Sequence, residues 1–313
     1  MSLPIRAYTT YFDQRYLARA LVMLRSLRRH DPAASVFPLC FDPISADMVA
    51  ALGDPGIVPV EPKILVAAEP RLAGCASRGR WEFYATHKAI LPLQVLAQNP
   101  TVQAIAHIDA DTCFFSSPAP LFVELGSASI GLSPHRFSPA FAPAIIHGRF
   151  NAGFIYWRRD ATGLRCLEEY REECLAWCFN RTEPDGRYMN QGYLTVWPER
   201  YENVNVLRHP GANLAYWNLA GHSLAPGAPP MVDGAPLIFH HFSNIHRDAA
   251  GNWRSPYGDF GVNQGVATGQ IYRPYLAAVD EMEAWLRGRV PWLVAPDAPA
   301  DLASMPVIAR PCR

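Results

Sequence analysis

Short apolar runs alternate with helical patterns through the first hundred residues of the chain. Residues 5–12 predict a strand, and residues 17–27 place apolar side chains at three- and four-residue steps, which predicts a helix packed on a sheet. Residues 36–41 and 57–60 predict the next two strands, and residues 81–97 predict a longer helix. This alternation is typical of parallel βαβ units.

The first predicted helix has recognisable flanks. Asp13 precedes it as the expected N-cap residue, because a short carboxylate accepts hydrogen bonds from free backbone N–H groups. Arg19, Arg25 and Arg28 follow the polar face, which we expect to be exposed.

The rest of the chain continues the α/β pattern. We expect further strands at residues 104–108, 129–132 and 154–157, a final strand at 237–241, and helices at 164–179 and 272–288. The stretch 225–236 is rich in Pro, Gly and Ala and is expected to form a loop or lid.

The predicted strand 104–108 ends in Asp109-Ala110-Asp111-Thr112. In open α/β sheets, ligands bind beyond the carboxyl ends of the strands. Side chains two residues apart point to the same side of an extended segment, so both carboxylates can reach one cation. Hard divalent ions take carboxylate oxygens and share their remaining positions with phosphates. A solvated loop is the alternative interpretation, because this short spacing also arises by chance.

Two amide-rich segments and a histidine pair are further candidates. Asn151-Ala152-Gly153 precedes an apolar run, and Asn190-Gln191-Gly192 follows Asp185. Their amides suit sugar hydroxyls, whereas ordinary turns are the alternative. His240 and His241 close a predicted strand and must face opposite ways, so at most one of them joins a given site. Imidazole is a good ligand for manganese beside carboxylates, and a hydrogen-bonded core histidine is the alternative.

Composition narrows the possible partners and functions. Lys and Arg (28) balance Asp and Glu (28), so no bulk charge favours nucleic acid or an anionic membrane. With 50% hydrophobic and 18% charged residues, the chain is expected to fold. The chain contains no GxSxG, P-loop, HExxH or GxGxxG motif, so hydrolase, P-loop kinase and simple dehydrogenase functions lack their usual signatures.

Cysteine usage and hydropathy bear on location. The 7 cysteines form an odd set without a CxxC pair, and the N-terminus lacks the pattern of a signal peptide, so we expect a reducing, cytoplasmic environment. No apolar run reaches the length of a transmembrane segment. Peripheral membrane contact stays open through the C-terminal helix, which carries Arg273, Arg287 and Trp285, although a helix docked on the protein is the alternative.

Taken in order, five short segments resemble the glycogenin-like, family-8 type of retaining nucleotide-sugar glycosyltransferase, which has the GT-A fold. The resemblance spans residues 5–255 as separate islands. The islands are Thr9-Thr10 with Tyr16, Thr86-His87-Lys88, Asp109-Ala110-Asp111-Thr112, Phe150-Asn151-Ala152-Gly153 and His241-Phe242.

The resemblance implies a role for each island. The threonines and Tyr16 would contact uracil, Lys88 would reach the donor phosphate or sugar, and His241 would complete a Mn²⁺ or Mg²⁺ site. The implied metal ligands are Asp109, Asp111 and His241, and the other implied donor-binding residues are Thr9, Thr10, Tyr16, Lys88, Ala110, Asn151, Ala152, Gly153 and Arg247.

Two departures from the family pattern affect the expected chemistry. Asn190-Gln191-Gly192 stands where the family commonly has Asp-Gln-Gly, so either Asp185 replaces the missing carboxylate beside Asn190 and Gln191 or none is needed. The late Gly-x-x-Lys-Pro-Trp motif is also changed, so Arg247 would have to replace the pyrophosphate lysine.

We therefore expect an α/β fold of GT-A type, a single domain whose Rossmann-like nucleotide-binding half has a mixed central sheet flanked by helices. Residues 1–255 would form this domain, with a nucleotide-binding half (about 1–125) and an acceptor half (126–255), followed by a C-terminal helical extension (256–313).

The expected activity is metal-dependent transfer of a sugar, with retention implied only by the resemblance, from a nucleoside diphosphate sugar such as a UDP-sugar to a carbohydrate, lipid-linked or protein acceptor. Tyr188, Trp217 and Trp253 are candidates for stacking on a sugar, with core packing as the alternative. The alternative functions are a non-catalytic nucleotide- or glycan-binding protein of the same fold and a sugar-nucleotide nucleotidyltransferase.

Overall fold

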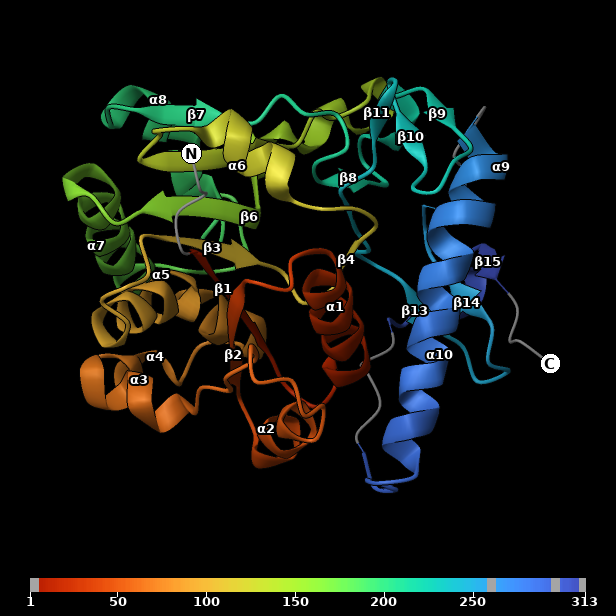
Figure 1. The fold of residues 1–313 in the computed structure, drawn as a ribbon, viewed down its shortest axis with the longest axis horizontal. Coiled ribbons are helices and arrows are strands. Elements are labelled where there is room, and N and C mark those ends of the chain that lie inside the picture. The colour runs from red at the N-terminus through yellow and green to blue at the C-terminus, as the bar shows by residue number, and fades with distance from the viewer. Residues whose placement is uncertain (1–5, 258–262, 294–298, 310–313) are drawn as a thin grey trace.

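A mixed six-stranded sheet forms the centre of the molecule (Figure 1). The structure is a computed structural model that describes residues 6–257, 263–293 and 299–309. The strand order is β2-β1-β3-β6-β5-β7. β1 is parallel to β2 and β3, β6 is antiparallel to β3 and β5, and β7 is parallel to β5. The expected α/β class, with a mixed central sheet flanked by helices, is confirmed.

The strands of the central sheet are β1 (Arg6–Phe12), β2 (Ser35–Cys40), β3 (Ala104–Ile108), β5 (Ile130–Pro134), β6 (Phe150–Arg158) and β7 (Val204–Val206). A second, three-stranded sheet contains β4 (Thr112–Phe114), β12 (Phe239–His241) and β8 (Leu214–Ala215). Two further small sheets contain β9 (Leu224–Ala225), β10 (Met231–Val232) and β11 (Ala235–Pro236), and β13 (His246–Arg247), β14 (Trp253–Arg254) and β15 (Val307–Ala309).

The α-helices are α1 (Leu17–His30), α2 (Pro43–Ala50), α3 (Pro62–Ala68), α4 (Leu72–Cys75), α5 (Arg80–Gln98), α6 (Ala119–Leu125), α7 (Ala161–Ala176), α8 (Trp197–Arg200), α9 (Gln264–Val266) and α10 (Arg273–Arg287). The other helical segments are the 3₁₀ helices η1 (Pro139–His147), η2 (Gly192–Val196), η3 (Leu219–Gly221) and η6 (Leu302–Ser304), and the π-helical η5 (Ala267–Tyr272).

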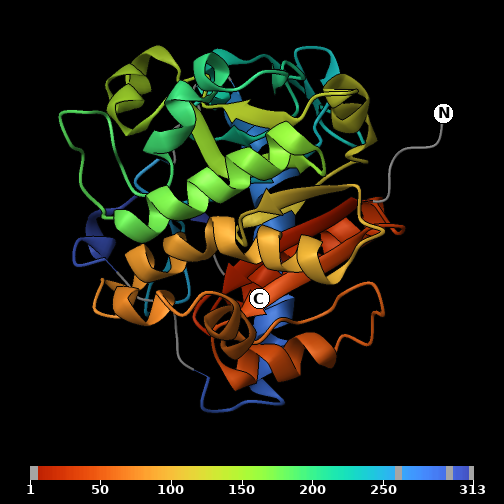
Figure 2. The same cartoon turned by 90° about the vertical axis from the view of Figure 1, so that its left-hand side faces the viewer.

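Helices cover both faces of the central sheet, so two apolar cores form. Strand side chains alternate between them: Tyr8 joins the core beneath α1, whereas its neighbour Ala7 joins the core beneath α5 and α7. Figure 2 shows α5 and α7 running side by side across the second face. Both cores are built from elements of the two halves of the chain, which gives the strand ends a rigid base.

The C-terminal helix packs on the first helix of the chain. α10 lies beside α1 (Figure 1), and its buried residues Leu276, Val279 and Leu286 belong to the same core as Leu21 and Leu24. This packing supports the docking alternative for the helix. The proposed division near residue 255 stays a prediction.

Several local expectations were wrong. The α1 helix begins after Tyr16, and no side chain caps it, because the Asp13 carboxylate is bonded to the Arg15 backbone N–H instead. Arg19 is buried and donates to the Ile245 carbonyl oxygen, so it is not exposed as expected. Residues 57–60 make only isolated bridges to β2.

Two further segments contain more strand than the sequence predicted. Residues 225–236 contribute to the β9-β10-β11 sheet, because Val232 and its neighbours pair in an antiparallel ladder on each side. Asn151 and Gly153 lie within β6, opposite a register shift in β5, so the alternative of an ordinary turn does not hold for this segment. β12 is followed by β13, β14 and β15, and is therefore not the final strand.

Within the described part of the chain, no helix has the length and apolar character to cross a membrane. The described cysteines are all free thiols, and five of these six side chains are buried, with Cys113 partly exposed. Cys312 lies outside the described residues.

Candidate functional site

A cavity of about 480 Å³ opens beyond the carboxyl ends of β1 and β3. Its walls come from distant parts of the sequence, including Tyr16 after β1, Lys88 on α5, Asp109 after β3, Asn151 on β6 and His241 on β12. We call the part around Asp109 and Lys88 the charged end and the part lined by Trp217 and Tyr216 the aromatic end; the two adjoin at His241, whose ring lies 5.3 Å from that of Trp217. The cavity volume is in the range that holds a small-molecule ligand.

The turn after β3 fixes Asp109. Its backbone N–H donates to the Gly153 carbonyl oxygen at 3.0 Å, which continues the β3–β6 pairing by one residue. The Thr112 hydroxyl donates to the Asp109 carbonyl oxygen at 2.9 Å and closes the turn. The Asp109 carboxylate therefore projects from the end of a buried strand into the cavity.

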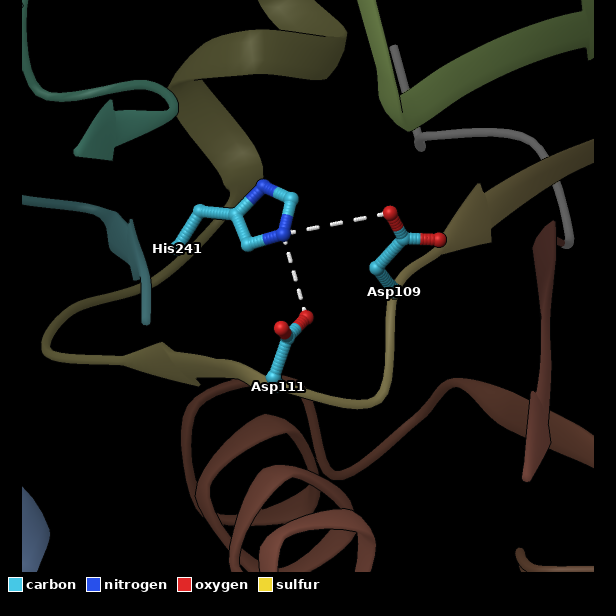
Figure 3. Close-up of side chains that lie close together, drawn as sticks. All are labelled: Asp109, Asp111 and His241. Atoms are coloured by element: carbon cyan, nitrogen blue, oxygen red, sulfur yellow. Dashed lines mark ion pairs between the residues drawn. The ribbon is translucent and has the colours of Figure 1, made fainter. Parts of the chain in front are cut away.

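One oxygen of the Asp109 carboxylate is held by protein groups. The Lys88 ammonium donates to Oδ1 at 2.7 Å and to the Ala152 carbonyl oxygen at 2.9 Å, and His107 Nε2 lies 3.0 Å from the same Oδ1. These bonds leave Oδ2 directed toward His241 (Figure 3). Asp109 is therefore oriented with one oxygen available for a cation.

Burial and charge act in opposite directions on this cluster. Burial would raise the pKa of Asp109, but Lys88, His107 and His241 bring that pKa well below its ordinary value. Burial and the nearby Lys88 ammonium lower the pKa of His107 to about 4. His107 is thus neutral at physiological pH, and its Nε2 carries the proton shared with Asp109.

The second sheet brings Asp111 and His241 together. His241 on β12 pairs with Thr112 on β4, and the Phe242 N–H donates to the Asp111 carbonyl oxygen at 2.8 Å. His241 Nε2 lies 3.0 Å from Asp111 Oδ1 and 3.9 Å from Asp109 Oδ2 (Figure 3). Ligand atoms of the three residues all lie within 4.8 Å of one another.

The other ring nitrogen of His241 is also engaged. Nδ1 lies 3.3 Å from Asn151 Oδ1, which favours a proton on Nδ1 and a lone pair on Nε2, as in metal-bound histidines. Burial alone would lower the pKa of His241, but Asp111 and Asp109 raise it, which favours a second proton on Nε2. A cation held by the two carboxylates would compete with this second proton for Nε2. The donor set fits a hard or borderline divalent ion such as Mn²⁺ or Mg²⁺.

Gly153 is required for this approach. A Cβ atom there would lie 2.6 Å from Asn151 Oδ1 and 2.7 Å from His241 Cε1, closer than such contacts allow. The absence of a side chain lets Asn151 and His241 meet over the strand.

The amide segment at 190–192 adjoins the cluster through Ala152. Gln191 Oε1 accepts from the Ala152 N–H at 3.0 Å, and its Nε2 donates to the His147 carbonyl oxygen at 3.0 Å. Asn190 is buried, and its Nδ2 donates to the Ala85 carbonyl oxygen at 3.0 Å. Both residues line the cavity, although their amide groups also tie neighbouring segments together.

The cavity wall contains only part of the expected set of donor-binding residues. Tyr16, Lys88, Ala110, Asn151 and Ala152 line it.

Thr9 and Thr10 are buried in β1, where the Thr9 hydroxyl donates to the Ala106 carbonyl oxygen at 3.4 Å. Gly153 is behind the wall, where its carbonyl oxygen bonds Asp109.

Asp185 and Arg247 are also placed elsewhere. Asp185 is exposed and pairs with Arg187 at 2.7 Å, outside the cavity wall. Arg247 turns to α10, where it pairs with Asp280 and with Glu283 at 3.2 Å. Neither expected role, the replacement carboxylate nor the replacement phosphate cation, agrees with these positions.

Sequence reasoning missed much of the remaining wall. Trp81 and Tyr84 on α5 line the cavity near Tyr16, whose ring meets the Trp81 ring edge-on at 5.3 Å. Asp13 also lines this part and accepts from the Tyr84 hydroxyl at 3.1 Å. The aromatic start of the α5 helix was a usable signal, because large aromatic side chains contribute strongly to contact surfaces.

The aromatic end of the cavity was predicted only in part. Trp217 and Tyr188 line it, whereas Trp253 is buried beside Arg247 and does not. The Tyr216 and Tyr257 rings stack at 3.8 Å, and Phe141 meets both edge-on. These contacts join segments far apart in the sequence, and no local pattern announces them.

Comparisons with known proteins agree with the fold. No protein-family model matches the chain. It is 32% identical over 251 residues to the uncharacterized protein YfnF of Bacillus subtilis (strain 168), covering 76% of this chain and 80% of YfnF. YfnD of the same organism, also uncharacterized, is 27% identical over 242 residues, covering 76% of this chain and 77% of YfnD.

Two solved structures share the architecture. The galactosyltransferase LgtC, crystallised with donor and acceptor sugar analogs, superposes with a TM-score of 0.51 at 15% identity, covering 91% of this chain and 100% of LgtC. The apo form of the glycosyltransferase GlyE from Streptococcus pneumoniae TIGR4 superposes with a TM-score of 0.50 at 14% identity, covering 94% of this chain and 65% of GlyE. At these identities the likeness concerns the fold, and it confirms the expected GT-A-type architecture.

Proposed function

The chain belongs to the same protein family as YfnF of Bacillus subtilis, and we propose that it is a metal-dependent glycosyltransferase of the family-8 type. It moves a sugar from a nucleoside diphosphate sugar, in the first instance a UDP-sugar, to an acceptor hydroxyl. The observation that carries this proposal is the convergence of Asp109, Asp111 and His241 within 4.8 Å at the charged end of a ligand-sized cavity. The shared fold with glycosyltransferases supports it.

The charges of the site suit a diphosphate. With His241 in the neutral form that binds a metal, the two carboxylates and the Lys88 ammonium carry one net negative charge, so a divalent ion would bring the site to one positive charge. When bound, such an ion supplies charge neutralisation to the leaving diphosphate. Asp109, Asp111 and His241 would hold it, and Lys88, fixed by Asp109 and Ala152, adds a second cation at the same end.

The protein's own contribution is mainly positioning. Tyr16 and Trp81 offer ring faces for a nucleobase at one side of the charged end. Asn151 and Gln191, each bonded to neighbouring backbone, form a fixed polar wall where the sugar would lie. Fixed geometry of this kind can remove several kcal/mol of barrier, because the reactants no longer lose orientational freedom in the transition state.

In the transfer itself, the bond between the anomeric carbon and the diphosphate oxygen breaks, and a bond from the acceptor oxygen to that carbon forms. The acceptor proton leaves to the departing diphosphate or to water. Asn190 and Gln191 face this region and carry no charge, so we assign them orienting roles rather than proton transfer. Retention of configuration is proposed from the family resemblance.

A non-catalytic nucleotide-binding protein is the second candidate, and one observation favours it. Asn190 stands where a carboxylate is common in the family, and its amide is engaged with the Ala85 carbonyl oxygen at 3.0 Å. Such a protein would bind nucleotide and metal but release no free nucleoside diphosphate from the sugar donor.

The test measures the melting temperature with UDP in the presence of Mn²⁺ or EDTA, because a ligand that binds only the native state raises it. We expect a rise that requires both Mn²⁺ and Asp111, so that Asp111→Ala abolishes it. Asp47→Ala, an exposed residue on α2, is the control and should keep the rise.

The other outcomes separate the candidates. A rise with a different nucleoside diphosphate alone would overturn the uracil assignment and keep the rest. If no combination of nucleotide and metal changes the melt, the glycosyltransferase proposal is wrong. Release of UDP from a panel of UDP-sugars then distinguishes the enzyme from the binding protein.

A further inference from the structure

The 3₁₀ helix η1 forms a thin wall between the cavity and solvent. Every residue in Pro139–His147 is apolar except the last, and none of the nine is buried. An exposed apolar segment of this kind usually marks a contact surface, because isolated surface hydrophobic residues seldom cluster so densely.

The period of the helix divides this segment into an inner and an outer side. In a 3₁₀ helix, residues three apart lie on the same face. Phe141, Ala144 and His147 follow this spacing, and all three line the cavity. The remaining faces include Ile145 and Ile146, which are 51% and 58% exposed. The same helix thus presents one face to the ligand and an apolar back to solvent.

The inner side belongs to the aromatic end of the cavity. Tyr216 stacks on Tyr257, Trp217 lies beside His241, and Tyr188 packs on His147 at 4.4 Å. Among the described residues that line this end, none is Asp, Glu, Lys or Arg. Aromatic rings with hydroxyl and indole groups at their edges suit the apolar faces and hydroxyls of a neutral pyranose.

We propose that the acceptor is a glycoside with a hydrocarbon aglycone, whose pyranose lies at the aromatic end and whose chain leaves the cavity over η1 and rests on Ile145 and Ile146. This inference depends on the proposed function for the presence of an acceptor site. It adds the chemical class of the acceptor.

The size of the surface favours this occupant over a macromolecule. A stable protein interface buries about 800 Å² on each partner and involves about 20–30 residues a side, far more than the outer side of a nine-residue helix. Membrane-surface helices combine a wide apolar face with a basic face, whereas η1 contains no Lys or Arg. The apolar strip is one helix wide and lies on the outer side of a helix whose inner side lines the cavity, which matches a single chain.

The test compares methyl and octyl β-D-glucopyranoside, and the corresponding galactosides, as ligands of the full protein saturated with UDP and Mn²⁺. Titration calorimetry is done with the octyl glycosides below the concentration at which they form micelles. For at least one sugar we expect the octyl glycoside to bind at least about tenfold more tightly, because burial of two methylene groups already gives this factor.

Two variants place the effect on η1. In the I145N/I146N double variant the gain from the octyl chain should be lost, while the melting-temperature rise with UDP and Mn²⁺ stays as in the wild type. Val123→Asn is the matched control, because Val123 is 72% exposed on α6 and does not line the cavity. It should keep the octyl gain.

Several results would overturn the inference. One is the absence of an octyl gain for either sugar, and another is a gain that survives in I145N/I146N. Flotation with sugar-free phosphatidylcholine vesicles that depends on Ile145 and Ile146 would assign η1 to a membrane surface instead. Self-association that the double variant abolishes would assign it to a second copy of the chain. An intact UDP and Mn²⁺ response in these cases would leave the proposed function standing.

Discussion

The two ends of the cavity are built by different means. At the charged end, Asp109 and His241 come from strand ends, and hydrogen bonds fix their orientation: Lys88 and His107 donate to Asp109, and Asn151 accepts from His241. At the aromatic end, the walls come from η1 and from loops, and ring stacking holds them, as between Tyr216 and Tyr257.

The two ends should differ in how well they tolerate small displacements of their side chains. A hydrogen-bonded cluster over a close-packed strand has one workable geometry, so a small displacement costs both binding and stability. Stacked rings on irregular segments can shift and still make contact. Substitutions at the charged end should therefore damage donor binding and folding together, whereas those at the aromatic end should weaken acceptor binding and leave the response to UDP and Mn²⁺ intact.

Gly153→Ala is the most severe test of the charged end. The added methyl would meet Asn151 Oδ1 at 2.6 Å and the His241 ring at 2.7 Å. We expect loss of the Mn²⁺-dependent response to UDP and a fall of about 3 kcal/mol in the free energy of unfolding. Urea denaturation and the melt with UDP measure both effects. Gly74→Ala is the control, because no atom lies within 4 Å of the added methyl there.

Lys88→Met removes the buried cation of the same end. It leaves Asp109 without the 2.7 Å bond, and breaking such a pair costs roughly 3–5 kcal/mol when both partners are buried. Asp109 is partly exposed, so we expect about 2 kcal/mol, with Mn²⁺ restoring more stability than in the wild type. Lys63→Met, at an exposed ion pair, should change little. An equal Mn²⁺ effect in Lys88→Met and the wild type would contradict the assigned role.

Tyr216→Ala tests the aromatic end. It removes the stack on Tyr257 and the edge contact with Phe141, which together should lower the free energy of unfolding by about 1.5 kcal/mol. Glycoside affinity should fall about tenfold for the same reason. The response to UDP and Mn²⁺ should be unchanged, and a loss of that response would show that the two ends are not independent.

The smallest expected effect concerns pH. Burial lowers the pKa of His87, behind the charged end, from the ordinary 6.5 to about 4. The unfolded chain binds a proton near pH 6.5 and the folded chain does not, so stability falls as the pH drops below about 6.5 and keeps falling until about pH 4. From about pH 7.5 to about pH 6.0 this single group costs about 0.8 kcal/mol. In His87→Phe, the fall in unfolding free energy between these two pH values should be smaller by that amount. An unchanged fall would assign the pH dependence to other groups.

The charged end was the part of the site that the sequence predicted best. Asp109 and Asp111 are close in sequence and follow a strand whose apolar run is unmistakable, so local spacing determines most of their geometry. His241 was expected beside them from its strand and from the family resemblance, and its ligand nitrogen lies within reach of both carboxylates.

The failures follow from contacts between distant segments. Arg247 pairs with Asp280 and Glu283 on a helix more than thirty residues away, a partnership that no local pattern encodes. Asn151 and Gly153 resemble a turn in sequence but pair within β6, because neighbouring strands impose extended backbone on them. Phe141 and Tyr257 reach the cavity through tertiary packing alone.

The packing of α10 on α1 affects how the chain is made. The buried face of α1 is complete by His30, but its cover begins only at Arg273, roughly 240 residues later. At about 5–20 residues per second, a ribosome needs roughly 10–50 s to synthesise that interval. During this time the apolar face of α1 lacks its final neighbour, so we expect the growing chain to expose hydrophobic surface until α10 is made. The last α-helix of the described residues is also the one that ends this exposure.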